Sequence, residues 1–136
     1  MSTEANKALV RHFVEAFNAG DLDGLAAAFA PNAVVHNSGA PNPLNVEGLK
    51  HLAALFLAAF PEGKHTIEDM VVEGDKVVTR ITYRGTHTGD LMGIPPTGKH
   101  VTTSAMTIDQ IANRKIVETW RLFDQMGMMQ QLGVMS

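Results

Sequence analysis

The residues best suited to chemistry gather near the C-terminus, in the segment 115–124 with the sequence KIVETWRLFD. Its β-branched and aromatic content predicts a strand, and side chains on a strand alternate between two faces. Glu118, Trp120 and Asp124 then share one face with two apolar residues, while Arg121 lies on the other face among apolar neighbours. Because both faces are mostly apolar, we expect helices to cover one and a cavity to adjoin the other, with Trp120 facing the cavity.

Asp124 is the first candidate for acid/base chemistry. A carboxylate beside Trp120 and Leu122 would lose hydration, its pKa would rise, and it would exchange a proton near neutral pH. The competing interpretation is a helix N-cap, because Asp is favoured at that position and the next helical pattern begins at Gln125. The two roles are compatible only if the carboxylate turns inward, so we expect it to point into the cavity near His36 or another polar partner.

Six histidines are spread along the chain: His12, His36, His51, His65, His87 and His100. No two of them have the H-x-x-x-H spacing or another compact ligand motif, so no metal site is predicted. His12 and His51 lie on predicted helices and are expected in solvent, while His65 lies in a predicted turn. His36 and His87 lie at strand ends, where they either face the mouth of a cavity or are structural.

The stretch 93–100, GIPPTGKH, differs by one residue from the phosphate-binding pattern G-x-x-x-x-G-K-[ST]. Two prolines remove backbone N–H donors that a phosphate loop needs, and His100 replaces the hydroxyl residue. A strand also follows where a helix should begin. We therefore predict a rigid loop between two strands.

The pattern of apolar residues predicts helices first and strands later. Steps of three and four residues predict helices over 4–18, 22–30, 46–60 and 125–135. Segments rich in Val, Ile and Thr predict strands over 33–37, 66–73, 76–87, 100–111 and 115–124, the last four as antiparallel neighbours, with the loop 38–45 as a rim. This order predicts a single α+β domain over residues 1–136, with helices packed on one face of a curved sheet.

The composition excludes several classes of protein. With 136 residues, of which 45% are hydrophobic and 18% charged, the chain can fold around its own core. Its net charge is −3 and no basic stripe is present, so no nucleic-acid partner is expected. There is no cysteine for a disulfide, a thiol nucleophile or a Cys-based zinc site. The start of the chain does not resemble a signal peptide and no apolar run has membrane-spanning length, so a cytoplasmic protein without membrane contact is expected.

Six blocks of the sequence resemble the SnoaL-like polyketide and ester cyclases, a family within the nuclear-transport-factor-two-like superfamily. They are NAGDLD at 18–23, FP at 60–61, IEDMVVEGDKVVTR at 67–80, GTHTG at 85–89, GIPPTGK at 93–99 and WRLFD at 120–124. The resemblance runs from about residue 9 to residue 133. It implies a cone of helices on a strongly bent antiparallel sheet with a deep pocket, and commonly a homodimer formed through the sheet.

The resemblance also implies roles for individual residues. In characterised cyclases of this family, an acidic residue acts as acid and base in the intramolecular aldol closure of a polyketide methyl ester, without a cofactor. Asp124 matches that residue in the W-x-x-x-D pattern, and His36 is carried over as its polar partner. Gln110 lies in a strand region where the characterised cyclases place a histidine. The candidates for substrate binding are Trp120, Arg80, His87 and Gln110.

The favoured function is therefore a cofactor-independent enzyme that acts on a hydrophobic, carbonyl-bearing small molecule, with aldol cyclisation as its most concrete form. An isomerase or an epoxide hydrolase of the same fold is one alternative, because the same cone can position a carboxylate and a water molecule. A non-catalytic module that binds a small ligand is another. In that module Asp124 only caps the last helix.

Overall fold

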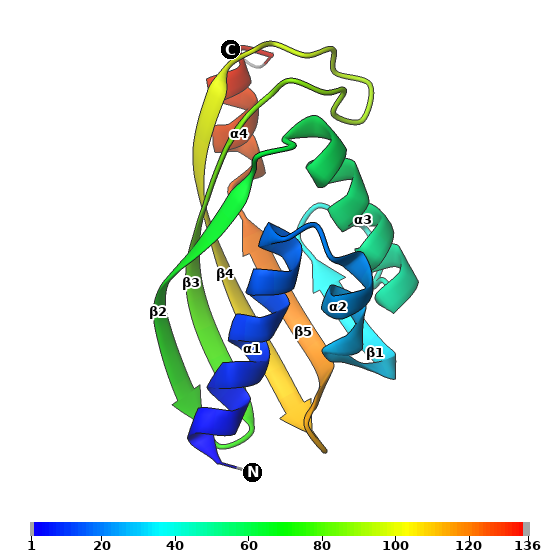
Figure 1. Ribbon diagram of the computed structural model, residues 1–136, viewed down its shortest axis with the longest axis vertical. Helices are drawn as coiled ribbons and strands as arrows, with labels where there is room; N and C mark the ends of the chain where they lie inside the picture. The colour runs from blue at the N-terminus through cyan, green and yellow to red at the C-terminus, as the bar shows by residue number, and fades with distance from the viewer. Residues whose placement is uncertain (1, 135–136) are drawn as a thin grey trace.

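The computed structural model describes residues 2–134 and shows helices packed on one side of a five-stranded sheet (Figure 1). In these residues the helices are Thr3–Asn18 (α1), Leu22–Ala27 (α2), Val46–Ala59 (α3) and Gln125–Leu132 (α4). The strands are Phe29–Asn37 (β1), Lys64–Glu73 (β2), Lys76–Thr86 (β3), His100–Ala112 (β4) and Lys115–Phe123 (β5). Each predicted element is present. The main differences are that α2 ends earlier and β1 begins earlier than predicted, and residue 135 of the last predicted helix lies outside the described residues.

The amphipathic pattern of α1 explains how this helix packs. Val10, Phe13 and Phe17 recur at helical spacing and are buried on one face. The Ser2 hydroxyl caps the helix by accepting a hydrogen bond from the Ala5 N–H at 3.0 Å. The helix thus directs two phenylalanine rings toward the sheet.

The other three helices share one capping arrangement. In α2, α3 and α4, the side chain of the N-cap residue accepts a hydrogen bond from the backbone N–H of a glycine three residues later. The pairs are Asp21 with Gly24 at 2.9 Å, Asn45 with Gly48 at 2.8 Å, and Asp124 with Gly127 at 2.8 Å. In α2 and α4, a side chain in place of the glycine would collide with the capping carboxylate. Glycine at this position therefore leaves room for the cap.

The sheet is mixed rather than wholly antiparallel. Its strand order is β1-β5-β4-β3-β2, and the three pairs formed by β2 to β5 are antiparallel, as predicted. β1 runs parallel to β5, so the expectation of an antiparallel sheet is wrong at this edge. A helix and three strands separate β1 from β5 in the chain, so no hairpin dictates their relative direction. Pro31 lies in this edge strand, where the register with β5 is irregular.

The two faces of the sheet have different surroundings. Figure 1 shows α1, α2 and α3 on the same side, which we call the inner face; the opposite side is the outer face. Ile81, Val101, Ile111 and Ile116 are buried in the core that the sheet forms with the helices. Among residues 2–134, no helix is both long and apolar enough to cross a membrane.

The last helix, α4, is attached to β4 by a side-chain amide. Gln131 accepts a hydrogen bond from the Thr102 N–H at 2.8 Å and donates one to the Thr102 carbonyl at 2.9 Å. Met128 and Leu132 on the same helix are buried. The C-terminal segment is thus part of the core, and it brings Met128 to the cavity described next.

Candidate functional site

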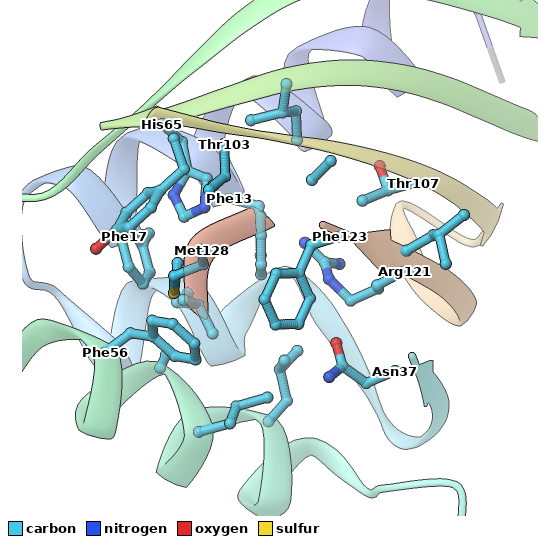
Figure 2. Close-up of a pocket in the computed structure, with 18 residues that line it drawn as sticks. Phe13, Phe17, Asn37, Phe56, His65, Thr103, Thr107, Arg121, Phe123 and Met128 are labelled. Atoms are coloured by element: carbon cyan, nitrogen blue, oxygen red, sulfur yellow. The ribbon is translucent and has the colours of Figure 1, made fainter. Parts of the chain in front are cut away.

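A cavity of about 120 Å³ lies between the inner face of the sheet and the helices (Figure 2). Aromatic and aliphatic side chains form most of its wall, including Phe13, Phe17, Phe56, Phe123 and Met128. Polar side chains line it as well, namely Asn37, His65, Tyr83, Thr103, Thr107 and Arg121. An apolar cavity with a few polar groups directed inward is the usual form of a small-molecule site.

Arg121 is the only lining residue in the described chain with a permanent charge. It extends from the inner face of β5, and its side chain is 15% exposed. Its Nη1 donates to Thr119 Oγ1 at 3.3 Å, and its guanidinium carbon lies 4.6 Å from the centroid of the Phe13 ring. Burial lowers the pKa of Arg121, while the neighbouring Asp109 acts in the opposite direction. The guanidinium stays charged at neutral pH, because the ordinary pKa of arginine is far above 7.

Asp109 is the buried partner of Arg121 on the neighbouring strand β4. Its side chain is 2% exposed, and its Oδ1 lies 3.8 Å from Arg121 Nη1. The Thr107 hydroxyl donates to Asp109 Oδ2 at 3.5 Å, but Oδ1 has no hydrogen-bond partner among the described residues. The two charges are close enough to attract each other strongly, yet their separation exceeds that of a hydrogen bond.

His65 was predicted to lie in a turn, but it lies in β2 and reaches the cavity from that strand. β2 begins one residue earlier, and His65 pairs with Tyr83 of β3. The Asn18 amide fixes this part of β2, since its Nδ2 donates to the His65 carbonyl and its Oδ1 accepts from the His65 N–H, both at 2.8 Å. The imidazole packs against the Phe17 ring, with 4.4 Å between centroids. Burial, with a smaller effect of Arg121, lowers the pKa of His65 to about 3, so the imidazole is neutral at physiological pH.

Tyr83 is held in place by close packing. Its hydroxyl is buried without a hydrogen-bond partner among the described residues, and burial raises its pKa. A Cβ atom at Gly63 would collide with this hydroxyl. Gly63 therefore makes room for the tyrosine, which stays protonated and contributes its ring to the cavity wall.

Asp124 does not point into the cavity, and the prediction that it would is wrong. Its side chain is exposed, and its Oδ1 accepts from the Gly127 N–H at 2.8 Å as the N-cap of α4. β5 ends at Phe123, so the strand alternation does not extend to residue 124. The geometry supports the capping interpretation, and the catalytic role of Asp124 stays a prediction.

Trp120 and His36 are brought together, but on the outer face of the sheet. The two rings stack with 5.4 Å between centroids, and Trp120 is 36% exposed. His36 Nε2 lies 2.7 Å from Glu118 Oε2. Trp120 and His36 border an open groove of about 560 Å³ beside the loop 38–45, the loop predicted to be a rim. Trp120 does face away from the helix-covered core, as predicted, but not toward the inner cavity.

A β-bulge changes the strand faces that simple alternation predicts. The pairing of β4 with β5 shifts between Gln110 and Ile111, which leaves Val117 without a partner in the register. Ile116 is consequently buried in the core rather than exposed on the face of Glu118. The predicted alternation therefore fails at Ile116, while from Glu118 to Phe123 it holds and only the face assigned to the cavity was wrong.

The remaining predicted binding residues are dispersed. Arg80 is exposed and donates to Asp69 Oδ2 from Nε at 2.8 Å and from Nη2 at 2.6 Å. Gln110 donates to a carboxylate in the turn after β2 at 3.2 Å. His87 is fully buried, and its Nδ1 accepts from the Thr97 N–H at 3.2 Å, which anchors the loop between β3 and β4. None of the three lines the cavity, so their roles in binding stay predictions.

Sequence reasoning missed the residues that do face the cavity or support it, above all Arg121, Asp109 and His65. A signal for two of them was present. Thr107, Asp109 and Ile111 alternate on one face of an apolar strand, and a charge at such a position requires a partner. Arg121 is the matching cation on the next strand, which was predicted to be an antiparallel neighbour, but the register that brings Arg121 close to Asp109 is known only from the structure.

The helices, the mixed sheet and the inner cavity define a protein with the nuclear-transport-factor-two-like fold, as expected. The chain belongs to the SnoaL-like polyketide cyclase family, whose model matches residues 7–132. A similar protein is the aklanonic acid methyl ester cyclase DnrD of Streptomyces peucetius, which is 31% identical over 140 residues. That alignment covers 98% of this chain and 92% of DnrD.

Two solved structures are also similar to this chain over most of its length. AclR from Streptomyces galilaeus, for which a hydroxylase activity has been suggested, has a TM-score of 0.91 and 29% identity, covering 99% of this chain and 89% of AclR. IdmH from Streptomyces antibioticus, suggested to be a polyketide cyclase, has a TM-score of 0.83 and 35% identity, covering 95% of this chain and 99% of IdmH. Similar structures are thus associated with different reactions, so the specific reaction must be argued from the site.

Proposed function

We propose that this protein catalyses an intramolecular aldol-type cyclisation of a hydrophobic, carbonyl-bearing small molecule in the inner cavity, with Arg121 as the group that binds the reacting oxygen. The observation that carries the proposal is a largely buried guanidinium in a mostly apolar cavity. Membership of the cyclase family and the similarity to DnrD support the reaction class. The substrate of this chain is part of the proposal.

The chemistry of an aldol closure matches what Arg121 can do. A C–H bond beside a carbonyl breaks, its electron pair forms an enolate, and the enolate carbon bonds to a second carbonyl carbon. The resulting alkoxide takes up a proton, so the product is an isomer of the substrate and no cofactor is needed. Negative charge develops on oxygen at each stage, and a preorganised cation in a water-poor cavity stabilises it. The released proton passes to water.

This proposal moves the central role from Asp124 to Arg121. Asp124 is exposed and its Oδ1 accepts a hydrogen bond from Gly127, whereas the Arg121 side chain is only 15% exposed and lines the cavity. The prediction of acid/base catalysis by Asp124 with His36 therefore has to pass its own test. Replacing Asp124 by Asn separates the two accounts, since an Asn can still cap the helix.

The proposal can be tested with aklanonic acid methyl ester, the compound named for DnrD, as the trial substrate. Cyclisation is followed by chromatography as conversion to a product of equal mass. Arg121→Met should lower the rate constant by about 10²- to 10³-fold, the usual effect of removing a donor to a developing oxyanion. Arg84→Met is the matched control, because Arg84 is exposed and does not line the cavity. Full activity of Arg121→Met would reject the proposal.

A second candidate is a non-catalytic module that binds a small ligand. It is favoured by one observation, that no carboxylate is among the described residues lining the cavity. If the wild-type protein binds aklanonic acid methyl ester or a smaller ketone, seen as a rise in melting temperature, but converts none, this candidate replaces the first.

The proposed assembly is a homodimer formed through the outer face of the sheet. Met106, Ile108 and Leu122 are exposed there, at 49%, 39% and 65%, and another copy would remove them from water. Sedimentation at micromolar concentration should show a dimer, and Leu122→Arg should give monomers. Met92→Arg, at an exposed loop position, is the control. A wild-type monomer would reject the dimer.

A further inference from the structure

Within residues 2–134, most hydrogen-bond donors of Arg121 are unused. A guanidinium carries five N–H groups, and among these residues this one makes a single side-chain hydrogen bond, from Nη1 to Thr119 at 3.3 Å. Asp109 Oδ1 lies 3.8 Å away, beyond hydrogen-bond distance, and itself lacks a partner among the described residues. The Arg121 side chain is 15% exposed and has donors available to an acceptor on a ligand, and an ionised acceptor makes the stronger hydrogen bond.

The surroundings restrict what that acceptor can be attached to. Phe13 lies against the guanidinium, with 4.6 Å from its ring centroid to the guanidinium carbon. Phe56 and Phe123, which both line the cavity, pack edge to face with 6.0 Å between centroids. Figure 2 shows these rings and Arg121 directed toward the same interior space. Aromatic walls of this kind favour a flat, unsaturated ring system as the ligand body.

The cavity also lacks a strong base. No carboxylate is among its described lining residues, and the pKa of His65 is about 3. A base with so low a pKa gains little driving force for taking a proton from a weakly acidic carbon near pH 7. Arg121, in contrast, lowers the pKa of any hydroxyl that it contacts in its ionised form, because an opposite charge favours the anion.

We propose that the cavity binds its ligand as a planar oxyanion, the ionised form of a phenol or of the enol of a 1,3-dicarbonyl, whose oxygen accepts hydrogen bonds from the Arg121 guanidinium. This rests on the proposed function and names the substrate class for the same site. The O–H bond of the free ligand breaks, its electron pair stays on oxygen, and the proton goes to water. The bound anion is then already the nucleophilic form from which ring closure proceeds, and the site needs no strong base.

The probe that tests this is 4-nitrophenol, whose anion absorbs visible light whereas the neutral phenol does not. Wild-type protein should shift the ionisation of bound 4-nitrophenol downward by about one pH unit or more, the usual effect of a close opposite charge. Its methyl ether, 4-nitroanisole, has the same ring but cannot ionise. At a pH where the phenol is ionised, the wild-type protein should bind the phenolate at least tenfold more tightly than the ether.

Variants locate the effect. Arg121→Met should abolish both the spectral shift and the preference for the anion, Arg121→Lys should retain part of both, and the outer-face control Arg84→Met should retain both fully.

Should Arg121→Met fail to fold, wild-type protein alone remains decisive. Its affinity for 4-nitrophenol should rise with pH through the ionisation of the phenol, while its affinity for 4-nitroanisole stays constant. Equal affinity for phenolate and ether, or a shift that survives in a folded Arg121→Met protein, would overturn the inference. Arg121-dependent phenolate binding without cyclisation of the trial substrate would instead reject the proposed function and leave the inference standing.

Discussion

The inner and outer faces of β5 carry similar residue types but differ in their surroundings. The inner face has Arg121 beside Asp109 at 3.8 Å, with side chains 15% and 2% exposed. The outer face has His36 beside Glu118 at 2.7 Å, with both side chains 35% exposed. The shorter pair is the weaker one, because water screens the outer pair and not the inner pair. Exposure, more than distance, decides which pair matters for stability and for chemistry.

The two charge pairs should respond very differently when one partner is removed. Asp109→Ala leaves the Arg121 charge buried without compensation and should lower the free energy of unfolding by about 3–5 kcal/mol. Glu118→Ala, the matched change on the outer face, should cost less than about 1 kcal/mol. Urea unfolding of both variants measures this. Equal losses would show that the two faces are not electrostatically different.

Acid should distinguish the buried His65 from an exposed histidine. The pKa of His65 is about 3 in the folded protein, below its ordinary value of 6.5, so the unfolded chain binds more protons in this window. Stability linked to His65 is therefore fully present above about pH 6.5 and is lost as the pH falls toward 3, with about 2 kcal/mol lost by pH 5. His65→Phe should remove this part of the pH dependence, measured by urea unfolding at pH 7 and pH 5. The exposed His12→Phe is the control, and an unchanged slope in His65→Phe would contradict the burial of a neutral imidazole.

The sequence was sufficient for the helices, most strands and the family, because these follow from local periodicity and from several short motifs. It was not sufficient for the site, since alternation on β5 gives two faces but does not say which one meets the helices. The cavity was predicted on the face of Trp120, which is the outer face, and the bulge at Val117 interrupts the alternation before Trp120. Arg121 and Asp109 become partners only through the pairing of β4 with β5.

Replacing Asp124, just after the end of β5, should have a smaller effect on the free energy of unfolding than replacing Asp109 or protonating His65. Because Asp124 is an N-cap, replacing it by Ala should lower the free energy of unfolding by about 1 kcal/mol. Replacing it by Asn should lower this free energy by only a few tenths of a kcal/mol. Asp21→Ala is the matched control, since Asp21 caps α2 in the same way. Cyclisation by Asp124→Asn should remain near the wild-type rate. A fall of about 10²- to 10⁴-fold with intact folding would restore Asp124 as the acid/base catalyst.

A crystal structure of the protein with 4-nitrophenolate tests most directly whether ligands bind on the inner face at Arg121. We expect the ring between Phe13, Phe56 and Phe123, with the phenolate oxygen within hydrogen-bond distance of the Arg121 guanidinium. A ligand found instead in the outer groove, stacked on Trp120 beside His36, would contradict binding at Arg121.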